Sequence, residues 1–402
     1  MRPKPLGPGV LAGTVFALAW GVAPGAAGQS IAELQAAIEG PQATPGEAGH
    51  GDRRLEDLLD ELGVPGVSVA VVRDFRIHWV KAYGVADVDT GRPVDVETLF
   101  QAASISKPVA AMAVLVAVED GLFDLDDDIN DVLTSWKLDG AGFTDRRPVT
   151  PRTLTSHTSG LGDGFGFPGY EPDTPVPTTV QILEGEAPSN VGPVLMEREP
   201  MTFHEYSGGG VTLMQLALSD ARHRPFADVL QDDVLDPIGM TRSTFLQPIP
   251  PNRDANAARA HGRRGESMGA KWHVYPELAA AGLWTTPSDL ARFVIEVQRA
   301  AAGEPGRVLT RSSAREMLSP VGVGPYAVGL GITQMGEGWY FGHGGSNWGF
   351  QASIMGHVTK GYGFAIMTNA AGGRALIDEI SRRIQNVYEW DSVAEPVRRG
   401  SD

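Results

Sequence analysis

Apolar residues near the start of the chain recur with two different periods, and each period predicts a different element. Four leucines between 55 and 62 follow the spacing of one helix face, and the Gly-Val-Pro segment at 63–65 ends that helix. Two runs rich in β-branched residues, 67–72 and 76–83, flank Arg73-Asp74. Alternation around such a polar pair is typical of two strands joined by a tight turn, so a β-hairpin is predicted here.

Loops and short helices dominate the middle of the chain, and strands dominate its last quarter. An apolar segment at 104–120 predicts a long helix, and Thr286-Pro287 has the residue types that begin another one. The stretch 326–370 is typical of consecutive strands with tight turns, and a last amphipathic helix follows it. Loops are expected through most of 122–205, with short helices near 211–222 and 226–235.

The order of strands, then helices, then strands predicts an α+β fold. Each group of strands is too small to be stable alone, so we expect one antiparallel sheet formed by the N- and C-terminal segments and flanked by helices. The mostly helical middle would be an inserted domain, and a cleft between the two parts would be the natural site. The predicted parts are one main domain at 53–390, with its sheet in 53–122 and 305–390 and its helical part in 123–304, and a polar tail at 391–402.

Residues 1–28 have the pattern of a secretory signal. A positively charged start precedes an apolar stretch at 10–22, and the small residues 26–28 offer a cleavage position. An uncleaved membrane anchor is the alternative, although the apolar stretch is short for a bilayer span. After cleavage, residues 29–52 are expected to form a loose segment. The sequence therefore predicts a secreted or periplasmic protein without a stable membrane span.

Composition narrows the possible functions. Lys and Arg number 33 against 49 Asp and Glu, a net charge of −16, which disfavours nucleic acid as a partner. The absence of cysteine excludes disulfides, thiolate metal sites and cysteine nucleophiles. The nine histidines are dispersed, and the acidic stretch from Asp124 has Ile129 and Ser135 where an EF-hand needs Gly and Glu. We therefore expect no metal and no other cofactor.

The segment from Ser104 to Pro108 is a candidate for nucleophilic chemistry. Proline fits only the first turn of a helix, so the helix should begin at or just before Ser104. Ser104 and Lys107 are three residues apart and share one helix face. A serine hydroxyl needs a base, and a neighbouring lysine can serve once its pKa is lowered. An ordinary helix start with a solvated lysine is the alternative that this segment alone leaves open.

Two further clusters each place a tyrosine or histidine side chain close to a run of glycines. Tyr206 is followed by glycines at 208–210, which let another group approach closely. His343 precedes glycines at 344–345 inside the predicted strands, where glycine often marks close approach by a ligand or another backbone. Each ring alone could equally be structural. Two common hydrolase signatures, a Gly-x-Ser-x-Gly elbow and a His-Glu-x-x-His zinc helix, do not occur.

Together the three clusters resemble the serine β-lactamase and penicillin-binding-protein superfamily. The likeness is greatest to its branch of class C β-lactamases, D-alanyl-D-alanine carboxypeptidases, D-aminopeptidases and family VIII esterases. An early Ser-x-x-Lys, a later tyrosine motif and a His/Lys-x-Gly motif near the C-terminus occur in the family's order, and the likeness spans roughly 50–390. Five flanking phrases also resemble the family: Gly63-Val-Pro-Gly-Val, Phe100-Gln-Ala-Ala-Ser, Leu154-Thr-Ser-His-Thr-Ser-Gly-Leu, Asp236-Pro-Ile-Gly-Met and Ala281-Gly-Leu-Trp-Thr-Thr-Pro-Ser-Asp-Leu.

The resemblance implies a role for each site residue. Ser104 would be the nucleophile that forms an acyl-enzyme, and Lys107 and Tyr206 would share the general-base role as a coupled pair. The backbone N–H groups of Ser104 and Ser346 would form the oxyanion hole. Substrate would lie against His343, with Gly344, Gly345 and Gly208 leaving room for it. His157, in the third of these flanking phrases, would serve packing.

Two positions depart from the pattern of many β-lactamases. Gly208 stands where Tyr-x-Asn has an amide, and His343 stands where a lysine would supply a permanent positive charge. These departures slightly favour esterase or D-amino-acid peptidase chemistry on a small ester, amide or peptide. A class C-like β-lactamase or D-alanyl-D-alanine carboxypeptidase acting on β-lactams or peptidoglycan fragments remains an alternative. A non-catalytic scaffold or penicillin-binding homologue is the alternative from another class.

Overall fold

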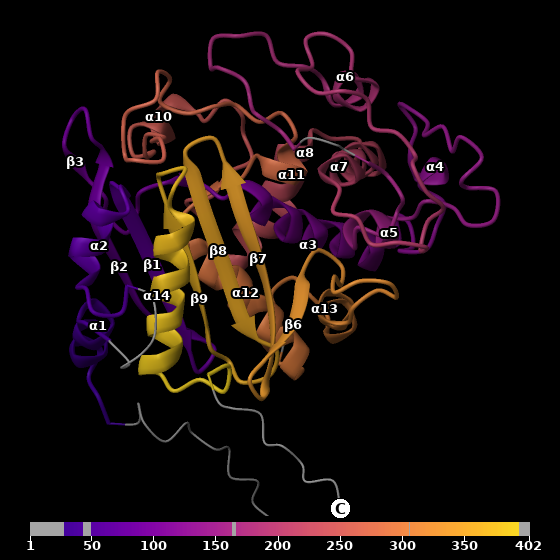
Figure 1. The fold of residues 1–402 in the computed structure, drawn as a ribbon. Coiled ribbons are helices and arrows are strands. Elements are labelled where there is room, and N and C mark those ends of the chain that lie inside the picture. The colour runs from indigo at the N-terminus through magenta and orange to yellow at the C-terminus, as the bar shows by residue number, and fades with distance from the viewer. Residues whose placement is uncertain (1–27, 43–49, 163–165, 305, 394–402) are drawn as a thin grey trace, which may run out of the picture.

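The computed structural model describes residues 28–42, 50–162, 166–304 and 306–393, and a seven-stranded antiparallel sheet forms its centre (Figure 1). The strand order is β3-β2-β1-β9-β8-β7-β6. The N-terminal hairpin joins the C-terminal strands through β1 and β9, where Val67 lies opposite Thr368. The strands are β1 (Gly66–Arg73), β2 (Arg76–Asp87), β3 (Arg92–Pro93), β6 (Gly331–Met335), β7 (Gly338–Asn347), β8 (Phe350–His357) and β9 (Gly363–Thr368). The predicted α+β fold, with one sheet built from both ends of the chain, is therefore confirmed.

Helices cover both faces of the sheet. On one face, α14 (Arg374–Val387) runs along the strands together with α1 (Ile31–Glu39) and α2 (Leu55–Glu61), as Figure 1 shows. Their buried leucines and isoleucines form one core with the apolar side chains of β1 and β9. On the other face, α12 (Pro287–Ala302) packs Ala291 against β1. Helix α12 falls within the predicted helical part, but it belongs to the layers around the sheet.

The N-terminal segment corrects one expectation. Residues 29–52 were predicted to be loose, yet α1 begins with a capping box between Ser30 and Glu33 and buries two apolar side chains. The fully buried Arg383 of α14 donates hydrogen bonds to the carbonyl oxygens of Ile38, Gly40, His50 and Arg53. A guanidinium with five donors can satisfy several carbonyls at once, which ties this segment to the body of the protein.

The signal-like segment lies outside the described residues except for Gly28, as does the end of the polar tail. Within the part of the chain that the structure describes, every helix is too short or too polar to span a bilayer.

The helical part lies beside one end of the sheet, with the long helix α3 (Ser106–Glu119) at its centre (Figure 1). Helix α3 is buried nearly all round, as expected for a helix enclosed by other elements. A two-stranded sheet of β4 (Phe100–Gln101) and β5 (Trp284–Thr285) lies next to its start. The remaining helices are α4 (Ile129–Val132), α5 (Pro151–Thr155), α6 (Thr179–Glu184), α7 (Gly208–Arg222), α8 (Phe226–Leu230), the π turn η2 (Gln231–Leu235), α9 (Asp236–Ile238), α10 (Pro251–Asp254), α11 (Leu278–Ala281) and α13 (Arg311–Leu318).

Candidate active site

Ser104 lies in a tight turn that leads into α3. It belongs to the 3-10 turn η1 (Ala103–Ile105), and the preceding Ala103 has a φ of 51°, a left-handed conformation that is uncommon for a residue with a Cβ. Ser106 holds this turn, because its hydroxyl donates to the Ala103 carbonyl (2.6 Å) and accepts the Leu283 N–H (3.0 Å). The helical start predicted near Ser104 is thus present, with strained backbone directly before the candidate nucleophile.

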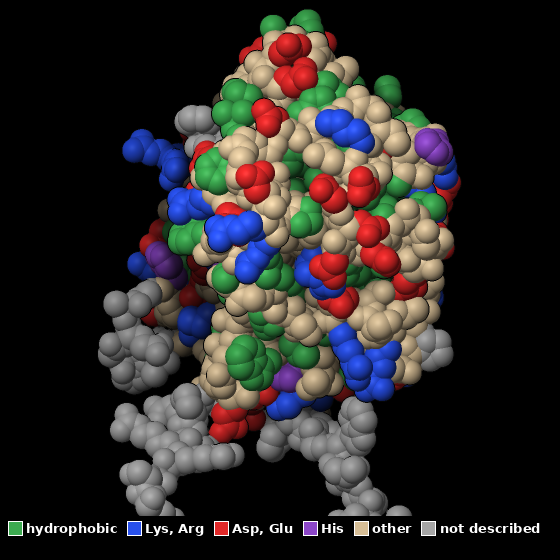
Figure 2. All heavy atoms as spheres, turned by 90° about the vertical axis from the view of Figure 1, so that its right-hand side faces the viewer, with side chains coloured by type: hydrophobic (Ala, Val, Ile, Leu, Met, Phe, Trp, Pro, Cys, Tyr) green, Lys and Arg blue, Asp and Glu red, His purple; other side chains and the backbone are tan. Residues whose placement is uncertain are grey.

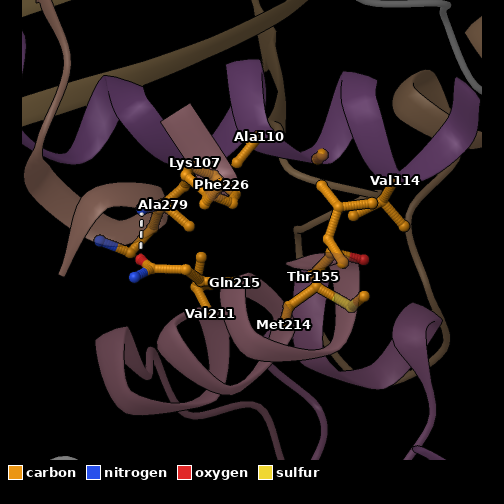
Figure 3. A pocket seen from close by; sticks show the side chains of 11 residues that line it. Lys107, Ala110, Val114, Thr155, Val211, Met214, Gln215, Phe226 and Ala279 are labelled. Atoms are coloured by element: carbon orange, nitrogen blue, oxygen red, sulfur yellow. Dashed lines mark hydrogen bonds between the residues drawn. The ribbon is translucent and has the colours of Figure 1, made fainter. Parts of the chain in front are cut away.

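Lys107 reaches the Ser104 hydroxyl from the first turn of α3. Its Nζ donates to Ser104 Oγ at 3.1 Å and to the Ala280 carbonyl at 2.9 Å, and the side chain is only 4% exposed. Behind it, α3, α7 and α11 enclose a cavity with room for about one water molecule (Figure 3). Apolar side chains such as Val114 and Met214 line most of this cavity. The alternative of a solvated lysine at an ordinary helix start is therefore excluded.

Tyr206 lies against the same amine. Its ring centroid lies 4.9 Å from Lys107 Nζ. The distance from that centroid to Ser104 Oγ therefore cannot exceed 8.0 Å, the sum of the two measured distances. Tyr206 precedes Ser207, whose hydroxyl accepts the Gly210 N–H and caps α7. Two motifs about a hundred residues apart in the sequence thus converge on one amine.

The short helix α11 links the elements that carry all three motifs. The Ala280 carbonyl accepts the bond from Lys107 on α3, and the Ala281 carbonyl accepts one from Asn347 Nδ2 on β7 (3.1 Å). The Ala279 N–H donates to Gln215 Oε1 on α7 (2.9 Å), the bond drawn in Figure 3. Backbone groups of three consecutive residues therefore connect α3, α7 and β7 around the candidate site.

Glu277, immediately before α11, is a buried carboxyl group that the sequence did not bring to attention. It has no exposed surface, and neither carboxyl oxygen has a hydrogen-bond partner among the described residues. Burial raises the pKa of Glu277 to about 7. A neutral carboxylic acid is therefore the form that suits this position below neutral pH.

The third motif lies on the open edge of β7. Strand β6 pairs with β7 only as far as Gly342. Strand β7 also contacts the turn η1 that carries Ser104. A Cβ at Gly345 would lie 2.2 Å from the Ala102 carbonyl oxygen, so this glycine makes room for the protein's own turn. A Cβ at Gly344 would lie 3.3 Å from an Arg374 nitrogen of α14. Gly344 and Gly345 were predicted to leave room for substrate, and in the structure the space beside each of them borders on groups of the protein itself.

His343 is a neutral group in this structure. Its Nδ1 donates to the Gly344 carbonyl at 2.6 Å, and the side chain is 7% exposed. Burial, together with the nearby Lys107 ammonium, lowers the pKa of His343 to about 3. With the proton on Nδ1, Nε2 is a buried acceptor, and it has no hydrogen-bond partner among the described residues. His343 thus offers a lone pair and no positive charge.

The other predicted residues have simpler environments. Gly208 is the first residue of α7, is buried, and its carbonyl accepts the Thr212 hydroxyl at 3.0 Å. Ser346 follows Gly345 on β7, and its hydroxyl accepts a bond from Gln351 at 2.8 Å. In the described ranges, no group of three or more His, Cys, Asp or Glu side chains is arranged to hold a metal ion.

Sequence reasoning missed Tyr326, which belongs to a cluster of rings around Tyr206. The Tyr326 ring lies 4.9 Å from His157, 5.4 Å from His204, 5.8 Å from His343 and 6.1 Å from Tyr206. Burial, and then the negative form of Tyr206, raise the pKa of Tyr326 to about 12, so its phenol stays protonated. A lone tyrosine in a loop before β6 carries no motif that could have identified it.

Comparisons with known proteins identify a family that covers most of the chain. The family described as Beta-lactamase matches residues 52–387. Penicillin-binding protein 4 of Amycolatopsis lactamdurans is 26% identical over 359 residues, 85% of this chain and 90% of that protein. Esterase EstB of Burkholderia gladioli is 26% identical over 323 residues, 73% and 78% of the two chains. The solved structure of D-amino acid amidase from Ochrobactrum anthropi SV3 is similar in fold, with a TM-score of 0.65, 23% identity and coverage of 88% and 99%.

Proposed function

The chain belongs to the β-lactamase family, and on this premise we propose that it is an exported serine hydrolase that cleaves ester or amide bonds through an acyl-enzyme on Ser104. One observation carries the proposal: Lys107 Nζ contacts the Ser104 hydroxyl at 3.1 Å while facing the Tyr206 ring at 4.9 Å. A hydroxyl bonded to a buried amine that itself faces a phenol ring has nearby the groups that general-base activation requires. The signal-like pattern of residues 1–28 supports export.

The proposed reaction has two acyl-transfer steps. The Lys107 and Tyr206 pair takes the proton of Ser104 as its oxygen attacks the carbonyl carbon of the substrate. The N–H groups of Ser104 and Ser346 stabilise the oxyanion, and the pair returns the proton to the leaving alcohol or amine. Water then attacks the acyl-enzyme, the same pair accepts its proton, and the acid product leaves as Ser104 recovers its hydrogen.

The substrate is proposed to be a small ester or a D-amino-acid amide or peptide. Two features support this preference over a dedicated β-lactamase: Gly208 offers no side-chain amide, and the neutral His343 offers no charge for a substrate carboxylate. Relatives named as an esterase and a D-amino acid amidase fit the same preference. Turnover of a chromogenic cephalosporin at a higher kcat/KM than any ester or amide would reverse it.

The test combines a substrate panel with intact-mass analysis. Wild type, Ser104→Ala and the control Ser312→Ala, an exposed serine on α13, are assayed on short esters, D-amino-acid amides, D-Ala-D-Ala peptides and β-lactams. We expect turnover by wild type and the control, and a loss on the order of 10⁴-fold or more in Ser104→Ala. A fluorophosphonate should add one adduct to both active proteins and none to Ser104→Ala. No adduct and no turnover for the wild type would favour the non-catalytic scaffold.

A further inference from the structure

His157 contacts the chain on both sides of Tyr206 and the tyrosine ring itself. Its Nδ1 accepts the Ser207 N–H at 3.2 Å, and its backbone carbonyl accepts the Glu205 N–H at 3.0 Å. The two rings lie 4.3 Å apart between centroids, tilted by 35°. Tyr206 is 39% exposed, so only part of its side chain is packed against the protein. The three contacts with His157 therefore contribute to fixing where this phenol lies.

The hydrogen bond from Ser207 determines the state of the His157 ring. Since the N–H donates to Nδ1, that nitrogen carries a lone pair, and the ring proton is on Nε2. Burial lowers the pKa of His157 well below its usual range, and the positive charge of the nearby Lys107 acts in the same direction. The imidazole is therefore neutral in the working pH range, and a protonated ring would lose the bond to Ser207.

The backbone at His157 is strained in a way that fits a fixed anchor. Its φ is 60°, in the left-handed region that asparagine tolerates better than most residues with a Cβ. Helix α5 holds the strained residue from the N-terminal side, because the Thr158 N–H donates to the Thr153 carbonyl at 2.9 Å. His157 is 2% exposed, so substrate does not reach it directly. Strain of this kind persists where the surrounding structure supports it.

We infer that His157 is a positioning residue, which holds the phenol of Tyr206 over Lys107 through its Nδ1 bond to Ser207. The inference rests on the proposed function, since it assigns His157 a part in the Tyr206 step of that reaction. His157 takes no proton in the reaction and touches no reacting atom. Displacing a catalytic group by about 1 Å can cost on the order of a hundredfold in rate, which is the scale on which such a residue acts.

The variants His157→Asn and His157→Gln both carry a polar, neutral amide, and they differ in whether its oxygen can replace Nδ1 as the acceptor of the Ser207 N–H. The asparagine oxygen lies three bonds from Cα, as Nδ1 does, whereas the glutamine oxygen lies four bonds away. The matched control is His357→Gln, because His357 is also buried and its Nδ1 accepts the N–H groups of Thr359 and Lys360, both at 3.0 Å. His357 lies at the opposite end of β8 from the candidate site. Ester turnover, unfolding free energy and fluorophosphonate labelling are measured for all three variants.

We expect His157→Asn to keep kcat within about threefold of wild type and His157→Gln to lose at least tenfold, with KM of both within about threefold. His357→Gln should be destabilised but keep its kcat. Equal kcat for the two His157 variants, or a change in KM alone, would overturn the inference and leave the proposed function standing. An inactive wild type that takes no label on Ser104 would instead overturn the proposed function, and the inference with it.

Discussion

Lowering the pH from 8 to 5 should not favour the turnover of substrates that carry a carboxylate. His343 occupies the position where a lysine would give a permanent positive charge, and an ordinary histidine there would become positive below pH 6.5. In the structure, burial and Lys107 lower the pKa of His343 to about 3, and its Nδ1 is already engaged with the Gly344 carbonyl. The imidazole should therefore stay neutral from pH 8 to pH 5.

The two cases differ enough to measure. A histidine with a pKa of 6.5 is about 3% protonated at pH 8 and about 97% protonated at pH 5, a change of roughly thirtyfold. With a pKa of about 3, only about 1% of His343 is protonated at pH 5. A substrate carboxylate stays largely ionised over the same range. Any increase in kcat/KM that a positively charged imidazole causes would therefore follow the protonation of His343 alone.

The assay compares a peptide substrate with the same peptide as its C-terminal amide. The ratio of their kcat/KM values cancels every titration that the two reactions share, including that of Lys107 with Tyr206. We expect this ratio to stay within about twofold between pH 8 and pH 5. His343→Lys, with a permanent charge, should raise the ratio several-fold at every pH. A ratio in the wild type that rises with a midpoint near 6.5, and no longer does so in His343→Gln, would refute the reasoning.

Three further predictions concern stability. In the unfolded chain His343 binds a proton below pH 6.5, whereas in the folded protein it does so only near pH 3, so this histidine makes the wild type more stable as the pH rises from 5 to 7. The variant His343→Gln lacks this effect, and its unfolding free energy should rise by about 2 kcal/mol less than that of wild type over the same interval. Glu277 acts with the opposite sign, because its folded pKa of about 7 exceeds the usual 4.5, so Glu277→Gln should gain about 2 kcal/mol more over the same interval. Urea titrations at the two pH values check both, and identical pH dependence in all three proteins would contradict them. Val114→Ile should stabilise by up to about 0.8 kcal/mol, because the added methyl group enters the cavity behind Lys107, whereas Val109→Ile, buried outside that cavity, should destabilise.

Local spacing was sufficient to predict the elements that carry the first motif. The proline at 108 limits where a helix can start, and a separation of three residues places Ser104 and Lys107 on one face, so their contact follows from helix geometry. The sheet was predictable for a similar reason, since two groups of strands, each unstable alone, had to pair with one another. The assignment of chemical roles to Ser104, Lys107, Tyr206 and Ser346 remains a prediction.

Properties that depend on burial could not be predicted in this way. The sequence alone offers only the reference pKa of histidine for His343, whereas its neutrality comes from packing against groups that lie more than a hundred residues away along the chain. The order in residues 31–39 depends similarly on Arg383, a charged residue that would ordinarily be assigned to the surface. In both cases the deciding contact joins segments that no local pattern connects.

Helix α11 shows why a further part of the site left no motif. Its contacts with Lys107, Gln215 and Asn347 use backbone N–H and carbonyl groups, which every residue except proline offers in full. Side-chain identity at 279–281 matters only for size, because these alanines are buried and a larger side chain would push α11 away from α3 and α7. The run of alanines therefore reflects packing. The function that we propose depends on this run, because small side chains let one backbone segment hold three motifs at bonding distance.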